Sequence, residues 1–388
     1  MSCRAWRLLL LAGLAAFLAE FDGAALPLAL PAIGAEFRAP LGELSNLGSL
    51  LVLGGLLSIP IAAVADRTGR TRLVALCVLG FSLADLGSAF STGLPMLGAL
   101  RFVAVACEAA VATIAPVLAV EEVPDQHRAL GVAGLTFIAT AGGGLTTIVY
   151  PFLAPHWRLL YLCGAVGIPI AALIWFGLPE SRSWIAAGHE ERPLRVLAEP
   201  RWRGRLLLLG VFSLLSVVTY EATSFFGVLY ASRSLHLQPP AISAILVVSG
   251  VVGAAGFLAG GWLSDRFGRR RLGVTFLVLT AVLSALAFAG TLPAYAIGYV
   301  AAPLAAGLAG PMTAAWFSEL FPTRARATSQ SLALGAGTIG AVASLQLVAL
   351  LAPRFGLGPA LAASALGLLA GALVLLRFPE TRGQPLPT

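Results

Sequence analysis

The sequence contains no lysine, because all 25 of its basic residues are arginine. A phosphate-binding loop of the GxxxxGK[ST] type therefore cannot form, and no lysine can serve as a Schiff base or general base. The chain cannot be its own ATP-driven pump of that kind. Any energy that it uses must come from an ion or solute gradient, or from a partner.

Charged residues, cysteine and histidine are also scarce. Only 11% of the 388 residues are charged, 58% are hydrophobic, and the mean hydropathy is +0.90. A soluble protein of this size could not hide so much apolar surface. The four cysteines and four histidines show no metal-ligand spacing, so we expect no metal site and no cofactor. No histidine lies in a predicted span and no nucleophile–base pair is visible, which argues against an enzyme.

Apolar stretches long enough to cross a bilayer recur along the chain. A spanning helix needs roughly 20 predominantly apolar residues. We place such spans at 7–30, 44–64, 73–91, 94–120, 129–153, 158–178, 205–230, 241–263, 272–290, 293–317, 327–351 and 357–378. The sequence therefore predicts an all-α membrane protein of about twelve transmembrane helices.

The arginines lie mostly on one side of these spans. If the N-terminus is cytoplasmic, 20 arginines fall in inside segments, four in outside loops, and Arg101 alone within a span. Cytoplasmic loops of membrane proteins carry this kind of excess, so both termini are expected in the cytoplasm. The net charge of +7 then reflects attraction to the anionic inner leaflet, and no nucleic-acid partner is needed to explain it.

Three motifs recur at a nearly constant offset. The repeated segments are Asp66-Arg67-Thr68-Gly69-Arg70 and Asp265-Arg266-Phe267-Gly268-Arg269, 199 residues apart; Glu121 to Arg128 and Glu319 to Arg326, 198 apart; and Pro179-Glu180-Ser181-Arg182 and Pro379-Glu380-Thr381-Arg382, 200 apart. Each copy occupies the same predicted loop of its half. The sequence thus predicts an N-terminal six-helix bundle over 1–178, a cytoplasmic linker over 179–204, and a C-terminal six-helix bundle over 205–388. Parallel halves of this kind are typical of one transporter architecture.

On these motifs the chain resembles the major facilitator superfamily. The D-R-x-G-R copies look like its signature for the loops after spans 2 and 8. The E-x-x-P-x-x-x-R and P-E-S/T copies look like the sugar-porter branch and its relatives, the organic-ion and aromatic-acid symporters. One departure is Ala62, where the signature usually has the glycine that stands at Gly261. The resemblance implies the major facilitator fold and transport by alternating access.

The resemblance also implies a cytoplasmic gate built from the charged loop motifs. A carboxylate at Asp66 or Asp265 can pair with an arginine or cap a neighbouring helix N-terminus. Such contacts would hold the gate shut and part when the halves rock. The alternative is that these arginines only anchor the loops inside. The candidate gate residues are Asp66, Arg67, Gly69, Arg70, Asp265, Arg266, Gly268, Arg269, Glu121, Arg128, Glu180, Arg182, Glu319, Arg326, Glu380 and Arg382.

Six ionisable residues lie inside predicted spans, where such groups are costly and by default functional. They are Glu20, Asp22, Asp85, Arg101, Glu108 and Glu221. Arg101 and Glu108 are seven residues apart and share one helix face. Glu20 and Asp22 point about 200° apart, so both can face one cavity only if the helix breaks at Gly23 or Pro27.

The resemblance supplies a partner for Arg101. In sugar porters an acid of span 1 pairs with a span-4 arginine that lies fifteen residues before a proline, as Arg101 precedes Pro116 here. Asp22-Gly23 also looks like the span-1 signature of aromatic-acid symporters. Protonation of Asp22 would weaken its pairing with Arg101, which gives a proton a different effect on two conformations. A permanent structural ion pair is the alternative. Glu20, Glu108 and Glu221 are further candidates for the proton-coupling or substrate cavity.

Two transporter classes are weakened by the sequence. Tyr220-Glu221 stands where sugar porters have paired glutamines, and Gly142–Gly144 lacks the proline of the drug–proton antiporters. We therefore predict a proton-coupled symporter of a small organic solute, with organic acids as a candidate class, that works as a monomer. Its partners would be protons, the substrate and the lipid of a bacterial inner membrane. A proton-coupled exporter and a non-transporting receptor remain alternatives.

Overall fold

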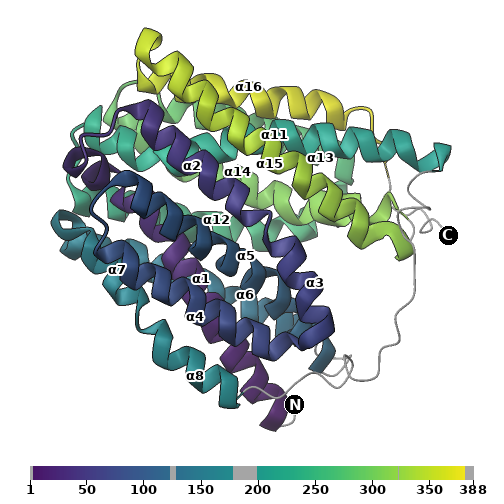
Figure 1. The fold of residues 1–388 in the computed structure, drawn as a ribbon. Coiled ribbons are helices and arrows are strands. Elements are labelled where there is room, and N and C mark those ends of the chain that lie inside the picture. The colour runs from purple at the N-terminus through teal and green to yellow at the C-terminus, as the bar shows by residue number, and fades with distance from the viewer. Residues whose placement is uncertain (1–2, 123–127, 178–198, 322, 381–388) are drawn as a thin grey trace. The chain divides into compact units, whose positions relative to one another are not determined.

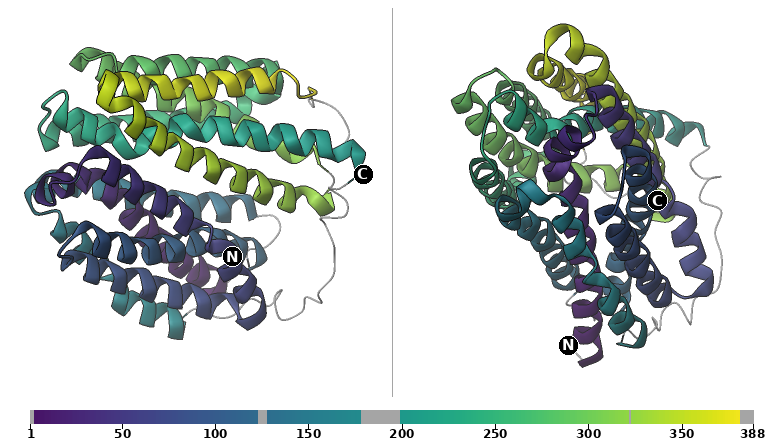
Figure 2. Two further views of the ribbon diagram at one scale, coloured as in Figure 1. Left: turned by 45° about the horizontal axis from the view of Figure 1, so that its top comes forward. Right: turned by 60° about the vertical axis from the view of Figure 1, so that its left-hand side comes forward.

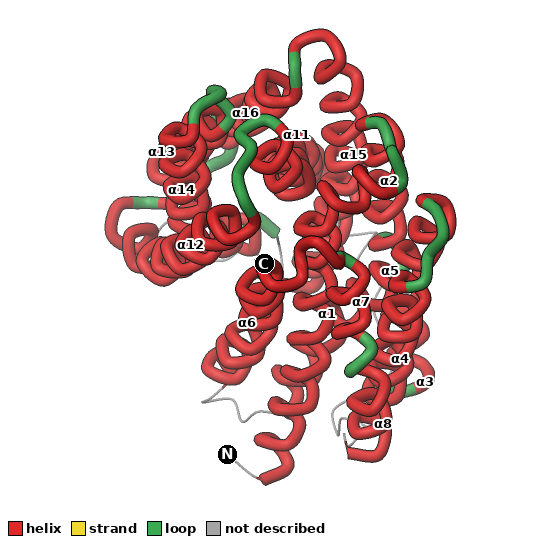
Figure 3. Tube along the Cα trace, turned by 90° about the vertical axis from the view of Figure 1, so that its left-hand side faces the viewer, coloured by secondary structure: helices red, strands yellow, loops and turns green. Residues whose placement is uncertain are grey.

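The structure, a computed structural model, describes residues 3–122, 128–177, 199–321 and 323–380. Every regular element in these ranges is a helix, and none is a strand (Figures 1 and 3). The chain divides into two compact units, Met1–His189 and Glu190–Thr388. The domain boundaries that the sequence predicts remain predictions, and each unit is described by itself.

In the N-terminal unit the described residues form eight α-helices and one 3-10 turn. They are α1 (Cys3–Glu36), α2 (Leu41–Gly55), α3 (Ser58–Thr68), α4 (Arg70–Ala89), α5 (Leu94–Glu122), α6 (Arg128–Leu153), the 3-10 turn η2 (Ala154–His156), α7 (Arg158–Gly164) and α8 (Gly167–Gly177). Helix α1 runs without interruption through Pro27 and Pro31. The break that would let Glu20 and Asp22 face one cavity is therefore absent from this helix.

In the C-terminal unit the described residues form six helices. They are α11 (Pro200–Arg233), α12 (Pro239–Phe267), α13 (Arg269–Ala287), α14 (Leu292–Glu319), α15 (Thr323–Phe355) and α16 (Leu357–Leu375). Figure 2 gives further views of the helices of each unit lying side by side. Helices suit a bilayer because they satisfy their backbone hydrogen bonds within the segment.

The described residues contain 12 segments that are long and apolar enough to span a membrane, which confirms the predicted fold class. Spans 2 and 6 are less regular than the sequence suggested. Span 2 consists of α2 and α3, and span 6 consists of α7 and α8. The cytoplasmic location of the termini stays a prediction.

The helices of the two units pack in the same pattern. Within the first unit α1 packs on α6, α2 on α5, and α4 on both α5 and α8. Within the second unit, the counterparts α11 and α15, α12 and α14, and α13 with α14 and α16 pack in the same way. The internal repeat of the sequence is therefore also a repeat of helix neighbours, as expected for two parallel-related bundles.

Two glycines at equivalent positions bring helix backbones together. A Cβ added at Gly142 of α6 would collide with the main-chain carbonyl of Phe17 on α1. A Cβ added at Gly340 of α15 would collide in the same way with the carbonyl of Leu214 on α11. Small residues allow such close approach of membrane helices. Each glycine therefore sets how closely the first span of its unit approaches the fifth, α1 to α6 in one unit and α11 to α15 in the other.

Candidate functional site

Arg101 lies at the centre of a buried charge cluster in the N-terminal unit. Its guanidinium on α5 donates two hydrogen bonds to the Asp22 carboxylate on α1, at 2.5 and 2.9 Å. The Nη2 atom also donates to Asp85 Oδ1 on α4, at 2.7 Å. One arginine thus joins three helices, and the two-pronged contact with Asp22 is the geometry in which arginine binds carboxylates most strongly.

Two further side chains complete the cluster. Glu108 lies two turns along α5 from Arg101, and its Oε1 is 4.0 Å from Arg101 Nη2. The predicted shared helix face is thereby confirmed. The Arg101 guanidinium also lies over the ring of Tyr161 on α7, 4.7 Å from the ring centroid. A cation over an aromatic face is attracted electrostatically by the ring.

The charges in this cluster do not balance. One guanidinium faces three carboxylates, so full ionisation gives +1 − 3 = −2. Asp22 and Arg101 are each 2% exposed and Asp85 is fully buried. Uncompensated charge is expensive in such surroundings, because little solvent is present to stabilise it. The cluster is therefore suited to hold one or two protons, and to gain or lose them when its surroundings change.

Small residues leave room for these carboxylates. A Cβ added at Gly164, the last residue of α7, would collide with the Asp85 carboxylate. A Cβ added at Gly23 of α1 would lie 3.5 Å from Glu108 Oε2. Gly164 is the sharper constraint, because it lets the backbone of α7 lie directly against the acid on α4.

The other two predicted cavity residues make none of the contacts described above. Glu20 of α1 is exposed, pointing away from its neighbour Asp22, as the unbroken helix requires. Glu221 of α11 is half-buried and belongs to the C-terminal unit. The structure thus brings together Asp22, Arg101 and Glu108 within the N-terminal unit and leaves Glu20 outside their cluster.

Asp85 and Tyr161 both contact Arg101, a partner that the sequence predicts for neither of them. Asp85 carried a usable signal, because it is an acid inside a predicted span. Tyr161 carried none, since a tyrosine near the end of a span is common at membrane interfaces.

The glycines of the two D-R-x-G-R copies turn the chain between helices. Gly69 separates α3 from α4 with a φ of 109°, and Gly268 separates α12 from α13 with a φ of 91°. Residues that carry a Cβ rarely adopt backbone angles in this left-handed region. The glycine of each motif therefore has a backbone role that is independent of charge.

Glu380 of the last motif caps a helix. Its two carboxylate oxygens accept from the main-chain N–H groups of Arg269 and Arg270 at the start of α13, at 3.1 and 2.9 Å. The Arg270 guanidinium in turn donates to the Leu376 carbonyl. A carboxylate at a helix N-terminus satisfies free N–H groups and complements the helix dipole. The third repeat motif thus docks on the first within the C-terminal unit.

The remaining gate candidates are only partly described. Arg266 is exposed and lies over the rings of its own-helix neighbours Trp262 and Phe267. Glu180, Arg182 and Arg382 lie outside the described residues. The side chains of Asp66, Arg67, Asp265, Glu121, Arg128, Glu319 and Arg326 are likewise not described. The gating role of these motifs remains a prediction.

The chain is similar to known membrane transporters over its whole length. The model of the Major Facilitator Superfamily matches residues 12–232 and 211–388. The chain is 28% identical to a gallate transporter of Pseudomonas putida, over 98% of this chain and 93% of that one. It is 29% identical to a 4-hydroxybenzoate transporter of Pseudomonas aeruginosa, over 87% and 84%. The crystal structure of a D-xylose–proton symporter, at 19% identity, covers 98% of this chain and 99% of its own with a TM-score of 0.76.

Proposed function

We propose, because this chain belongs to the Major Facilitator Superfamily, that it is a proton-coupled symporter that imports a small organic acid. It is an integral membrane transporter and not an enzyme. In the proposal it works by alternating access, as a monomer in a bacterial inner membrane. Both of its termini lie in the cytoplasm.

The observation that carries the proposal is the excess of carboxylates around Arg101. Three buried acids share one guanidinium, so the cluster takes up a proton more readily than a balanced ion pair would. A proton on Asp22 weakens two hydrogen bonds to Arg101 and leaves Asp85 as its charged partner. Coupling requires that a ligand interact differently with two conformations. A proton that changes which helix holds Arg101 meets that requirement.

The acid character of the substrate rests on the relatives. The two relatives named above carry gallate and 4-hydroxybenzoate in their names, and both substrates are hydroxylated aromatic acids. Arg101 is not assigned to the substrate carboxylate, because Asp22 and Asp85 already occupy its guanidinium. The cluster is instead assigned to the proton, and the substrate is bound elsewhere in the protein.

Uptake into reconstituted vesicles tests the proposal. We expect 4-hydroxybenzoate to accumulate when the outside is more acidic than the inside, and the accumulation to collapse when a protonophore is added. D-xylose serves as a neutral control and should not accumulate. Uptake that does not depend on the pH gradient would contradict proton coupling. Absence of uptake for every organic acid would contradict the proposed substrate class.

A proton-coupled exporter is the second candidate, because the same cluster can couple a proton to transport in either direction. Everted vesicles distinguish the two. An importer concentrates substrate in right-side-out vesicles with an acidic exterior, whereas an exporter concentrates it in everted vesicles with an acidic interior. Tags at both termini, which should report the cytoplasm, test the topology on which this assignment of sides depends.

A further inference from the structure

Matching hydrogen bonds align the first and fifth spans of the two units. Thr146 of α6 donates to the carbonyl of Phe21 on α1, at 2.7 Å. Ser344 of α15 donates to the carbonyl of Val218 on α11, at 2.5 Å. The hydroxyl residues differ by 344 − 146 = 198 and the carbonyl residues by 218 − 21 = 197. The offset between α1 and α11 is therefore 197, which no sequence motif in these spans gives.

The buried cluster has a counterpart in the C-terminal unit. The sequence motifs place α13 199 residues after α4, and α14 198 residues after α5. With these offsets Asp22 corresponds to Thr219, Asp85 to Ser284, Arg101 to Tyr299 and Glu108 to Ala306. All four counterparts line one cavity. Where the first unit holds four ionisable groups, the second unit has hydroxyls, a methyl group and open space.

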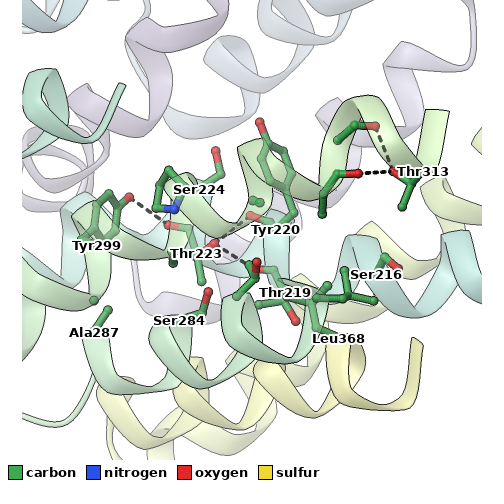
Figure 4. A pocket seen from close by; sticks show the side chains of 18 of the residues that line it. Ser216, Thr219, Tyr220, Thr223, Ser224, Ser284, Ala287, Tyr299, Thr313 and Leu368 are labelled. Atoms are coloured by element: carbon green, nitrogen blue, oxygen red, sulfur yellow. Dashed lines mark hydrogen bonds between the residues drawn. The ribbon is translucent and has the colours of Figure 1, made fainter. Parts of the chain in front are cut away.

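This cavity is large enough for a small molecule. It has a volume of about 490 Å³ and lies among α11, α13, α14 and α16 (Figure 4). Ligand pockets have volumes of roughly 300–1,000 Å³. None of the residues that line the cavity carries a charge. A bound carboxylate would therefore be desolvated without a compensating cation, which is unfavourable.

Most of the hydroxyl groups that line the cavity already donate their proton to a main-chain carbonyl. Six of them donate to main-chain carbonyls: Ser216 to Phe212, Thr219 to Ser364, Thr223 to Thr219, Thr280 to Phe276, Thr313 to Ala309, and Tyr299 to Thr223. Figure 4 shows several of these bonds as dashed lines. A hydroxyl has one proton but two lone pairs, so each oxygen can still accept. The cavity consequently favours a guest that donates hydrogen bonds over one that only accepts them.

Aromatic side chains form part of the wall. Phe288 and Tyr299 line the cavity, and Tyr299 packs on Tyr295 behind it with ring centroids 4.9 Å apart. Tyr295 in turn packs on Tyr230, with ring centroids 6.0 Å apart. Aromatic rings pack favourably in offset or edge-to-face arrangements, so this wall suits a planar ring.

We propose that this cavity binds the hydroxylated aromatic ring of the substrate. The ring hydroxyl donates a hydrogen bond to the threonine and serine oxygens that line the cavity and can still accept one. The proposal rests on the proposed transport of an organic acid, and it deepens it by naming a phenolic ring as the recognised group. The substrate carboxylate stays outside the cavity. The N-terminal unit thus binds the proton, and the C-terminal unit binds the uncharged end of the substrate.

Two ligands that differ in one hydrogen-bond donor test the hydrogen-bond direction. The probes are 4-hydroxybenzoate, whose ring hydroxyl donates, and 4-methoxybenzoate, whose ether oxygen only accepts. We expect the purified full-length protein to bind the first about fivefold or more tightly, which is what one hydrogen bond contributes. Thr280→Val removes one acceptor while keeping the side-chain shape. It should weaken binding of 4-hydroxybenzoate about fivefold and leave 4-methoxybenzoate unchanged.

Thr275→Val is the matched control, because Thr275 lies on the same helix, is exposed, and donates to its own helix at Arg271 in the same way. The proposal is overturned if Thr280→Val behaves as this control does, or if the two probes bind equally. Ala306→Phe, which fills the cavity, should abolish binding of phenol, an uncharged probe that needs no transport. If 4-hydroxybenzoate is still transported and bound normally by Ala306→Phe, the cavity assignment fails while the proposed function stands. If phenol binds the cavity but no acid is transported, the proposed function fails by itself.

Discussion

Asp85 lies 2.7 Å from Arg101 and holds the same guanidinium nitrogen that contacts Asp22. Arg101 therefore has a partner on α4 that remains in place when its partner on α1 is altered. This arrangement lets the charge on Asp22 change without leaving the arginine unpaired in the bilayer, where an isolated charge is costly.

Gly164→Ala should damage transport by displacing Asp85. The new methyl group would collide with the Asp85 carboxylate, so that either α7 or the acid must shift. Overpacking of this kind costs about 1–3 kcal/mol. We expect gradient-driven uptake to fall severalfold in vesicles that contain equal amounts of protein. Gly144→Ala is the control, because nothing lies within 4 Å of its Cβ position. Equal activity of the two variants would show that the fit of Asp85 is unimportant.

Arg101→Ala should destabilise the protein, because it leaves three buried acids without their cation. Removal of one partner from a buried ion pair costs about 3–5 kcal/mol. A lower unfolding temperature in detergent is the expected result, whereas Arg203→Ala, at an exposed site, should leave it unchanged. Adding Asp85→Asn to Arg101→Ala should recover part of the loss. A double variant no more stable than Arg101→Ala alone would contradict the charge argument.

Much of this architecture could be predicted from the sequence. Hydropathy gave the twelve spans, because a lipid-facing helix must be apolar along its whole length. The spacing of Arg101 and Glu108 gave their shared face, because both lie on one helix. The pairing of Asp22 with Arg101, which the family resemblance implied, is also present in the structure. Its role in proton coupling remains a prediction.

The contributions from other helices could not be predicted in this way. Periodicity tells which face of a helix a residue occupies, but not which helix lies opposite. Asp85 reaches Arg101 only because α4 packs on α5, and Gly164 matters only because α7 crosses Asp85. The cavity of the C-terminal unit was missed for a related reason. Thr219 and Ser284 are neutral and carry no signal of their own, and the offset that links Thr219 to Asp22 appears only in the helix contacts of the folded units.

Glu380→Ala should loosen the start of α13. The variant removes both acceptors for the N–H groups of Arg269 and Arg270, and loss of such a cap costs about 0.5–2 kcal/mol. Faster hydrogen exchange at these two amides is the expected observation, and Glu380→Gln, which keeps one acceptor oxygen, should have an intermediate effect. Glu43→Ala, an exposed acid on α2, serves as the control. Unchanged exchange in Glu380→Ala would mean that the cap does not hold α13 in solution.

Asp22→Asn should abolish gradient-driven accumulation but spare exchange of substrate across the membrane. Exchange needs only loaded carriers to reorient, whereas accumulation needs a proton to bias which state is loaded. The neutral asparagine would mimic an acid that is always protonated, so the proton no longer changes the pairing of Arg101. Asp85 still holds the arginine at 2.7 Å, and the protein should therefore remain folded.

The size of the required bias makes this prediction strict. Moving a two-state equilibrium from 1:99 to 99:1 takes about 5.5 kcal/mol of differential binding. Only a buried charge interaction, such as the two-pronged contact of Asp22 with Arg101, supplies several kcal/mol when it is broken. We expect the internal-to-external substrate ratio of Asp22→Asn to fall to about one, with counterflow within about twofold of the unaltered protein. Glu20→Gln, at an exposed site outside the cluster, should accumulate substrate normally. If Asp22→Asn still concentrates substrate against its gradient, the coupling proton is held by Asp85 or Glu108 instead, and the same pair of assays on those two acids identifies which.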